Sequence, residues 1–191
     1  YSRSSSSATK NILDNGVIIS AGKVKSFKSG PRIFDDGAFS HSERCALYGE
    51  LDTIIDYTEK SSPAGADHDG NTPAGGFFRH LNTIGRMDGS ERWLAANLAI
   101  AGQSVDTLDA GAPRESQRRV LAMANAHARA GNRTARLGAC IFSQGGADRT
   151  LSHTARIAQL RAFWEHVKAD AQAAALTVDA ETKLFVPVVD N

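Results

Sequence analysis

Cysteine is scarce in this chain: only Cys45 and Cys140 occur among its 191 residues. Two cysteines can form no more than a single disulfide, so the chain is not a small domain held together by a disulfide framework. Long apolar runs are also missing, because no stretch of about 18 apolar residues occurs, which argues against a membrane-spanning helix. We therefore expect a soluble globular protein; its compartment stays open, with secretion as one alternative.

Nucleotide-binding loops are missing too. The chain contains no G-x-x-x-x-G-K-[ST] sequence and no glycine-rich turn of the dinucleotide-binding kind between a strand and a helix. Lysine is absent from residues 111–161, although this segment is the most basic part of the chain. It has nine arginines against two acidic residues, a net charge of +7, whereas residues 1–110 and 162–191 each carry −3. This separation of charge indicates an anionic partner, either outside the chain or within it.

Apolar periodicity and turn residues predict an α+β protein, with α/β as the alternative, built from a small sheet and about four helices. Residues 1–10 are rich in serine and are expected to form a flexible N-terminal arm, followed by a single globular domain over 11–191. Residues 61–76 contain no large apolar side chain and are expected to form a functional loop. Strands are expected over 16–22, 23–27, 135–143 and 183–189, and helices over 43–59, 87–103, 111–131 and 150–174.

Two of the expected helices have an apolar stripe. In residues 43–59 the stripe consists of Leu47, Leu51, Ile54 and Ile55. In residues 150–174 it consists of Ile157, Leu160, Trp164, Val167 and Ala171. Spacings of three and four residues place each set on one side of a helix, so both stripes are predicted to be buried.

The segment FSHSERCALYGELDTIIDYTEK, residues 39–60, holds the strongest candidates for chemistry. His41 and Cys45 are four residues apart and would lie on one face of a helix, and imidazole and thiolate are both zinc ligands. Glu43 follows His41 with the H-x-E spacing of zinc deaminases, in which the glutamate transfers protons. The P-C-x-x-C half of that pattern is absent, and Cys140 is the other cysteine that could complete the ligand set. We predict His41, Glu43 and Cys45 as catalytic residues, with a zinc ion on His41 and Cys45 as a hypothesis.

Two other interpretations of this segment stay open. Ser40 and Glu43 have the S-x-x-E spacing of a capping box, in which both side chains satisfy amides of the first helical turn without any catalysis. Cys45 would then be a small buried apolar residue. In the second interpretation, Cys45 is a nucleophile activated by the helix N-terminus, with His80 or His68 as its base.

The arginines of residues 111–161 are the candidates for substrate binding. A guanidinium group pairs with a phosphate or a carboxylate through two parallel hydrogen bonds. The predicted anion-binding residues are Arg114, Arg118, Arg119, Arg133 and Arg136. In the alternative, the acidic flanks of the chain fold against these arginines and neutralise them within the molecule.

These features predict an enzyme that acts on a nucleotide, a nucleic acid or another anionic substrate. A secreted bacterial effector or toxin-type hydrolase or deaminase fits this description. The alternative is a non-enzymatic, self-assembling structural or adaptor protein, a homo-oligomer whose arginine-rich face binds an anion or nucleic acid. The sequence specifies neither the substrate nor the reaction.

Overall fold

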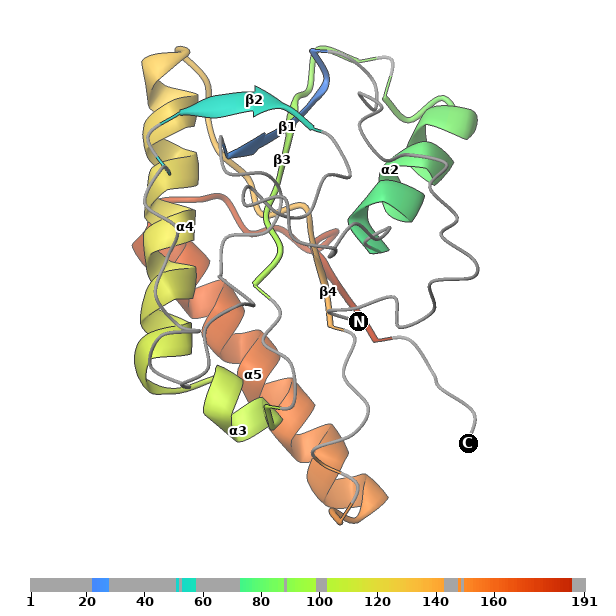
Figure 1. Ribbon diagram of the computed structural model, residues 1–191, viewed down its shortest axis with the longest axis vertical. Coiled ribbons are helices and arrows are strands. Elements are labelled where there is room, and N and C mark those ends of the chain that lie inside the picture. Colours follow the sequence, from blue (N-terminus) through green and yellow to red (C-terminus); the bar gives the residue numbers. More distant parts are fainter. Residues whose placement is uncertain are drawn as a thin grey trace, which may run out of the picture. The chain divides into compact units, whose positions relative to one another are not determined.

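The computed structural model describes residues 22–27, 51, 53–57, 73–87, 89–98, 103–142, 148 and 150–186. The chain divides into two compact units, an N-terminal unit of residues 1–99 and a C-terminal unit of residues 100–191. Within the described residues, helices combine with small sheets of two and three strands, which confirms the predicted α+β class (Figure 1). Of the helices among these residues, none has the length and apolar character that crossing a membrane requires. The single domain over 11–191 stays a prediction.

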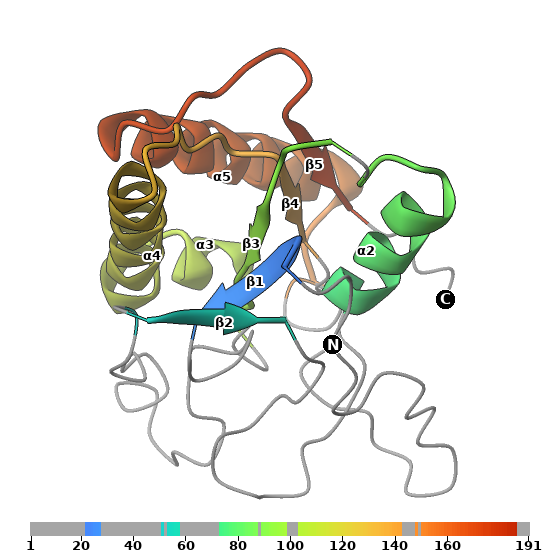
Figure 2. The ribbon, with the colours of Figure 1, turned by 90° about the horizontal axis from the view of Figure 1, so that it is seen from above.

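The N-terminal unit contains a three-stranded sheet and one described helix. Strand β1 (Val24–Phe27) lies between β2 (Ile54–Asp56) and β3 (Trp93–Ala95) (Figure 2). It is antiparallel to β2 and parallel to β3. Two parallel neighbours cannot be joined by a tight turn, because the chain must cross back to the end of the sheet at which the first strand began. Helix α2 (Pro73–Thr83) lies in the segment between β2 and β3.

Aromatic rings pack α2 against this sheet. Phe78 of α2 is buried, and its ring stands edge-on to the ring of Tyr57, with centroids 5.7 Å apart. The ring of Trp93 on β3 lies 6.0 Å from that of Phe78, and Val24 of β1 belongs to the same cluster. An aromatic pair of this kind contributes about 0.5–1.5 kcal/mol beyond the burial of its area. Contacts between distant parts of the sequence therefore hold α2 in place.

Asp56 links β2 to β1 through polar contacts. Its Oδ1 accepts a hydrogen bond from Nζ of Lys25 at 2.7 Å and another from the backbone N of Gly22 at 2.9 Å. These hydrogen bonds lower the pKa of Asp56, so its carboxylate is ionised at neutral pH. Lys25 and Asp56 are directly opposite each other on the two strands, where opposite charges stabilise an antiparallel pair.

The C-terminal unit begins with two helices, α3 (Val105–Leu108) and α4 (Gly111–Ala130), and continues as a β–α–β unit. Strands β4 (Ala139–Ile141) and β5 (Lys183–Phe185) are parallel neighbours, and α5 (His153–Ala173) connects them. Because a parallel pair cannot be joined by a tight hairpin, the long helix between the two strands is the expected connection.

Two apolar clusters hold the C-terminal unit together. The first packs α3 and the end of β4 against α5, and its buried members are Val105, Phe142, Phe163 and Val167. The second packs α4 against the last turn of α5, and its buried members are Leu121, Ala171 and Leu176. Both clusters use the same long helix, so α5 is the element on which the rest of this unit is assembled.

Helices α4 and α5 both end in a Schellman motif. After α5, Ala175 adopts a left-handed conformation with φ of +60°, and its backbone N donates to the Gln172 carbonyl O at 2.9 Å. The backbone N of Leu176 donates to the Ala171 carbonyl O at 2.9 Å, and these two residues share the second cluster. After α4, Asn132 takes the left-handed position with φ of +53°.

Five expected elements are confirmed over their described residues. These are the strands at 23–27, 135–143 and 183–189 and the helices at 111–131 and 150–174, which correspond to β1, β4, β5, α4 and α5. The stripe of α5 is shifted, however, because Ile157 is 37% exposed whereas Phe163 is buried. The buried residues of α5 are Phe163, Val167, Asp170 and Ala171, so a charged side chain belongs to its buried face.

The predicted helix over 43–59 is wrong in its described part. Ile54–Asp56 is strand β2, and Ile54 and Ile55 are each 37% exposed instead of forming a buried helical stripe. Thr53, Ile54 and Ile55 are β-branched, and such residues favour strands over helices. Three consecutive β-branched residues therefore outweigh the spacing of the apolar ones.

The predicted helix over 87–103 is also wrong. Trp93–Ala95 forms β3, and the described residues 89–98 contain no helix. The helix of this region is α2, which begins inside the loop predicted at 61–76. Gly75 and Gly76 weaken its local helical signal, and the burial of Phe78 supplies the stabilisation that local preference does not.

Replacement of Ala175 by glycine should stabilise the protein. A left-handed alanine costs about 1 kcal/mol that glycine avoids, so we expect Ala175→Gly to raise the free energy of unfolding by about that amount. Ala173→Gly, at an exposed position in the last turn of α5, is the control and should lower it by up to about 1 kcal/mol. Urea unfolding measures both, and a loss of stability in Ala175→Gly would contradict the Schellman geometry.

Candidate functional site

The residues predicted as catalytic, His41, Glu43 and Cys45, lie outside the described residues, as does His68. Their arrangement and the zinc hypothesis therefore stay predictions. His80, the other base considered for Cys45, lies exposed in the last turn of α2.

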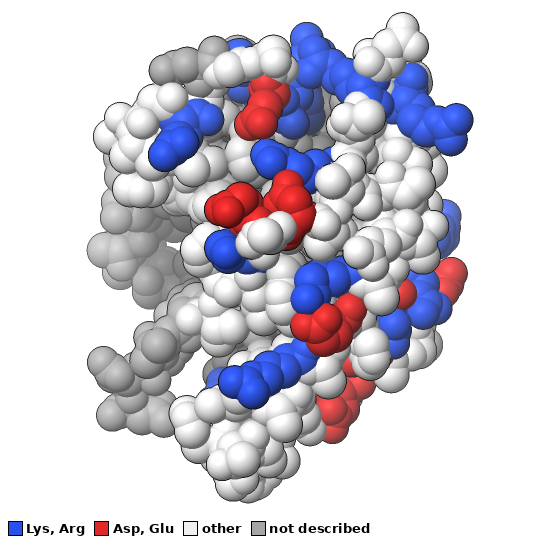
Figure 3. Space-filling model, turned by 180° about the vertical axis from the view of Figure 1, so that it is seen from behind, with Lys and Arg blue, Asp and Glu red and all other residues white. Residues whose placement is uncertain are grey.

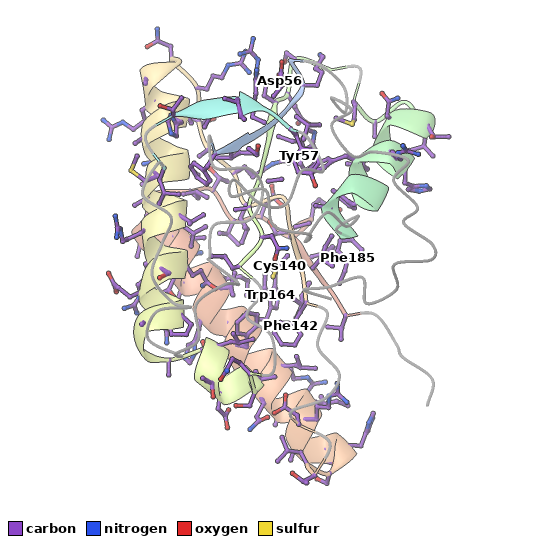
Figure 4. The ribbon with its side chains drawn as sticks, in the orientation of Figure 1. Asp56, Tyr57, Cys140, Phe142, Trp164 and Phe185 are labelled. Carbon is purple, nitrogen blue, oxygen red and sulfur yellow. The ribbon has the colours of Figure 1, made fainter. Side chains whose placement is uncertain are left out.

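Cys140, the second cysteine, lies partly buried on β4. It packs against the first cluster of the C-terminal unit, beside Phe142 and Trp164 (Figure 4). Burial raises the pKa of its thiol to about 12, so the thiol is protonated at neutral pH and is a poor zinc ligand and nucleophile. Among the residues that the structure describes, no group of three or more His, Cys, Asp or Glu side chains could hold a metal ion.

The polar cluster with the most developed geometry lies where α3, α4 and α5 meet. Asp170 of α5 is only 6% exposed, and two arginines of α4 bind its carboxylate. Arg114 donates from Nε to Oδ2 at 2.9 Å and from Nη2 to Oδ1 at 3.2 Å. Arg118 donates from Nε to Oδ1 at 3.0 Å. We call Arg114, Arg118 and Asp170 the Asp170 clamp.

The Asp170 clamp is charged at neutral pH. Burial acts to raise the pKa of Asp170, but the hydrogen bonds from Arg114 and Arg118 outweigh it, and this pKa lies below its ordinary value. The hydrogen bond with Asp170 in turn raises the pKa of Arg114. Arg114 and Arg118 are four residues apart, so successive turns of α4 bring both guanidinium groups to one carboxylate.

Two of the five predicted substrate-binding arginines, Arg114 and Arg136, pair with aspartates inside the molecule. Arg114 is 21% exposed and holds Asp170 through two hydrogen bonds. Arg136 pairs with Asp179, with Nη1 and Oδ2 3.4 Å apart. Both acidic partners belong to residues 162–191, so the predicted alternative of internal neutralisation describes these two arginines. On the face drawn in Figure 3, basic and acidic side chains lie next to one another, as such pairing requires.

The other predicted arginines are exposed, although Arg118 also donates to Asp170. Arg118 is 49% exposed, with Nη1 3.6 Å from Glu115, and Arg119 and Arg133 are exposed, as is Arg129. We call Arg118, Arg119, Arg129 and Arg133 the α4 arginine face. Arg118 and Arg129 are eleven residues apart, close to three helical turns and about 16 Å, so they lie on one side of α4. Glu115 is the one acidic residue within α4.

A histidine lies one turn before Asp170 on α5. Nδ1 of His166 is 2.6 Å from Oδ2 of Asp109, the residue that caps the C-terminal end of α3. The Asp109 side chain is 16% exposed and the His166 side chain 45%. The backbone N of Asp109 donates to the Val105 carbonyl O at 2.9 Å, which ties the aspartate to the buried start of α3.

Sequence patterns do not reveal Asp109, His166 and Asp170 as a group. His166 is separated from Asp109 by 57 residues, and Asp170 is separated from Arg114 by 56, so no local spacing joins either pair. One signal was present for Asp170, which falls on the helical face defined by Phe163 and Val167. A charge on a buried helical face needs a charged partner, and the arginines of residues 111–136 are the candidates for that partner.

No family model, curated protein or solved structure matches this chain.

Asp170→Asn should destabilise the protein. The substitution keeps the size of the side chain but removes its charge, and hydrogen bonds to charged groups contribute about 1.5–3 kcal/mol, so we expect the free energy of unfolding to fall by about 2 kcal/mol. Glu115→Gln is the control, since Glu115 is 65% exposed and its pair with Arg118 should contribute less than about 0.5 kcal/mol. Equal effects in urea unfolding would contradict the clamp.

The lowered pKa of Asp170 predicts where this stability is lost. A carboxylate with a depressed folded pKa stabilises the fold above the pKa of an unfolded aspartate, about 3.9, and stops doing so as pH falls through the lower folded value. Between about pH 5 and pH 2 we therefore expect wild type to lose more free energy of unfolding than Asp170→Asn. Parallel pH curves for the two proteins would show that Asp170 is not stabilised in its ionised form.

Proposed function

We propose that this protein acts on a nucleic acid or another polyanion and binds it through the α4 arginine face. The supporting observation is that four arginines on and directly after α4 are exposed, while Glu115 is the one acidic residue of that helix. Arginine pairs with phosphate oxygens through its planar fork, and phosphate contacts supply most of the affinity of non-specific nucleic-acid binding.

The length of the α4 arginine face favours a polymer over a mononucleotide. Arg118 and Arg129 are about 16 Å apart along the helix. Each strand of a duplex carries a phosphate about every 3.4 Å of its axis, so a contact of this length meets several phosphates. A single nucleotide would engage only one end of the face.

The Asp170 clamp supports this role by holding Arg118. The Nε of Arg118 is bound to Asp170 and half of its side chain is exposed, so an external phosphate would compete for the Nη groups only with the exposed Glu115, 3.6 Å from Nη1. An arginine that is already ordered loses less rotamer entropy when it binds a phosphate. Arg118 therefore belongs both to the Asp170 clamp and to the α4 arginine face.

The reaction that we propose is hydrolysis or deamination at His41, Glu43 and Cys45, with zinc on His41 and Cys45. Its support is the residue types and the H-x-E spacing. An effector or toxin-type enzyme secreted by a bacterium is the class that this combination of chemistry and polyanion binding fits.

Self-assembly is the second candidate, and one observation favours it. Carboxylates are already the partners of Arg114 and Arg136 inside the chain, so an acidic protein surface is a second ligand that suits the α4 arginine face. In this case the face would dock on another copy of the chain and form a homo-oligomer.

Loss of two exposed arginines should weaken polyanion binding. Arg119→Ala with Arg129→Ala removes two cations from the α4 arginine face, and each lost phosphate contact lowers the salt slope for single strands by about 0.7. We therefore expect a slope smaller by about 1.4 for a fluorescent single-stranded oligonucleotide, measured by anisotropy over a range of salt concentrations.

Arg86→Ala with Arg92→Ala is the matched control, because it removes the same charge from exposed positions of the N-terminal unit. An equal loss in this variant would attribute binding to net charge rather than to the α4 arginine face. Self-assembly would be supported instead if wild type did not bind the oligonucleotide but formed concentration-dependent oligomers, and if Arg119→Ala with Arg129→Ala abolished these oligomers.

Glu43→Gln separates catalysis from capping. Glutamine also serves in a capping box but cannot transfer protons, so we expect ammonia release from, or hydrolysis of, a single-stranded DNA oligonucleotide to disappear while stability is kept. Ser40→Ala should do the reverse, lowering the free energy of unfolding by about 1 kcal/mol with turnover retained. Full turnover in Glu43→Gln would leave only the capping interpretation.

A further inference from the structure

We propose that His166, oriented by Asp109 and with Arg114 held one helical turn away on Asp170, is a catalytic base that cleaves RNA by transesterification. This proposal rests on the proposed function, because the α4 arginine face must bind the RNA. It adds a substrate class and a catalytic residue that are independent of residues 41–45.

The geometry of His166 is that of an oriented base. With Nδ1 2.6 Å from Oδ2 of Asp109, the neutral imidazole keeps its proton on Nδ1 and has its lone pair on Nε2. A partly buried carboxylate on the other ring nitrogen fixes the tautomer and stabilises the imidazolium that forms when the base accepts a proton. The side chain of His166 is 45% exposed, so a substrate can reach the ring.

Asp109 is itself held in place. Its backbone closes the last turn of α3, and Val105 at the start of that helix is buried against α5. A second contact, from Nε2 of Gln159 on α5 to Oδ2 of Asp106 at 2.7 Å, ties α3 to the same helix. The two residues of the pair therefore sit on elements that are fixed to each other.

A cation lies beside this pair. His166 and Asp170 are four residues apart on α5, and side chains at this spacing are neighbours on one helical face. Arg114 donates from Nε to Oδ2 of Asp170 at 2.9 Å, which places its guanidinium at the turn of α5 that follows His166. A fixed cation at this position stabilises the negative charge that develops on a phosphate in the transition state.

The substrate class follows from what surrounds the base. Asp109 is the only hydrogen-bond partner of His166 within the part of the chain that the structure describes, so no described side chain stands ready as a nucleophile. RNA brings its own nucleophile, the 2′-hydroxyl, next to the bond that breaks. DNA lacks this group.

The reaction needs no further reagent. Nε2 of His166 takes the proton of the 2′-hydroxyl, the 2′-oxygen forms a bond to phosphorus, and the bond from phosphorus to the 5′-oxygen breaks. The 5′-oxygen takes a proton from water, and the imidazolium returns its proton to the hydroxide that results. The products are a 2′,3′-cyclic phosphate and a free 5′-hydroxyl.

The test is cleavage of a labelled single-stranded RNA oligonucleotide by wild type and His166→Asn, with binding measured separately by anisotropy. Asparagine can still donate a hydrogen bond to Asp109 but cannot act as a base. General base catalysis contributes about 10²–10⁴-fold, so we expect His166→Asn to cleave at least about 100-fold more slowly with its affinity for RNA kept. His153→Asn, at the exposed first residue of α5, is the control and should keep the wild-type rate.

Two further measurements make the result specific. The product should carry a 2′,3′-cyclic phosphate, and RNA methylated on its 2′-oxygens should bind without being cleaved. Asp109→Asn should lower kcat with KM unchanged, which a purely structural role would not do.

Binding of RNA without cleavage, or full activity in His166→Asn, would overturn this proposal and leave polyanion binding in place. A wild-type protein that binds single-stranded DNA but not RNA would overturn this proposal alone, and one that binds neither would overturn the proposed function as well.

Discussion

The carboxylate of Asp170 is almost completely buried. A buried charge that has no charged partner destabilises the folded state. Three hydrogen bonds from Arg114 and Arg118 provide the compensation. They come from one face of α4 and end on one side chain of α5, so they fix how the two long helices meet. The second apolar cluster lies at the same junction and excludes the water that would weaken these charged contacts.

This arrangement divides the arginines of the basic segment into two groups. Arg114 and Arg136 neutralise aspartates of the acidic C-terminal residues. Arg119 and Arg129 are exposed, and Arg118 belongs to both groups, since its Nε is bound inside and half of its side chain is outside. Part of the charge of this segment, which has a net charge of +7, thus serves the fold, while Arg119 and Arg129 stay exposed on α4.

The C-terminal unit was more predictable from sequence than the N-terminal unit, for a physical reason. Helices α4 and α5 are long and periodic, so each turn repeats the same signal and errors at single positions such as Ile157 do not matter. Strands β2 and β3 have three residues each, and α2 has two glycines near its start, so their local preferences are weak. Aromatic packing around Phe78 stabilises this part of the fold. For β3 and α2 no local window carries that information, whereas β2 had a local signal in the β-branched residues 53–55.

The site shows the same limit. The arginines could be predicted from composition, since a run of one charge is visible along the chain. The residues that orient these arginines could not be predicted. Asp170 meets Arg114, and His166 meets Asp109, only after α3, α4 and α5 have packed together. Sequence therefore predicted the chemical character of this surface but not the groups that orient it.

A double-mutant cycle between Arg114 and Asp170 tests the central claim most directly. It compares the free energies of unfolding of wild type, Arg114→Gln, Asp170→Asn and the double variant, and so isolates the interaction between the two side chains. A coupling free energy of at least about 1 kcal/mol is the result that the clamp requires. A coupling near zero would mean that α4 and α5 are held together by their apolar cluster alone, and that the order attributed to Arg118 has another origin.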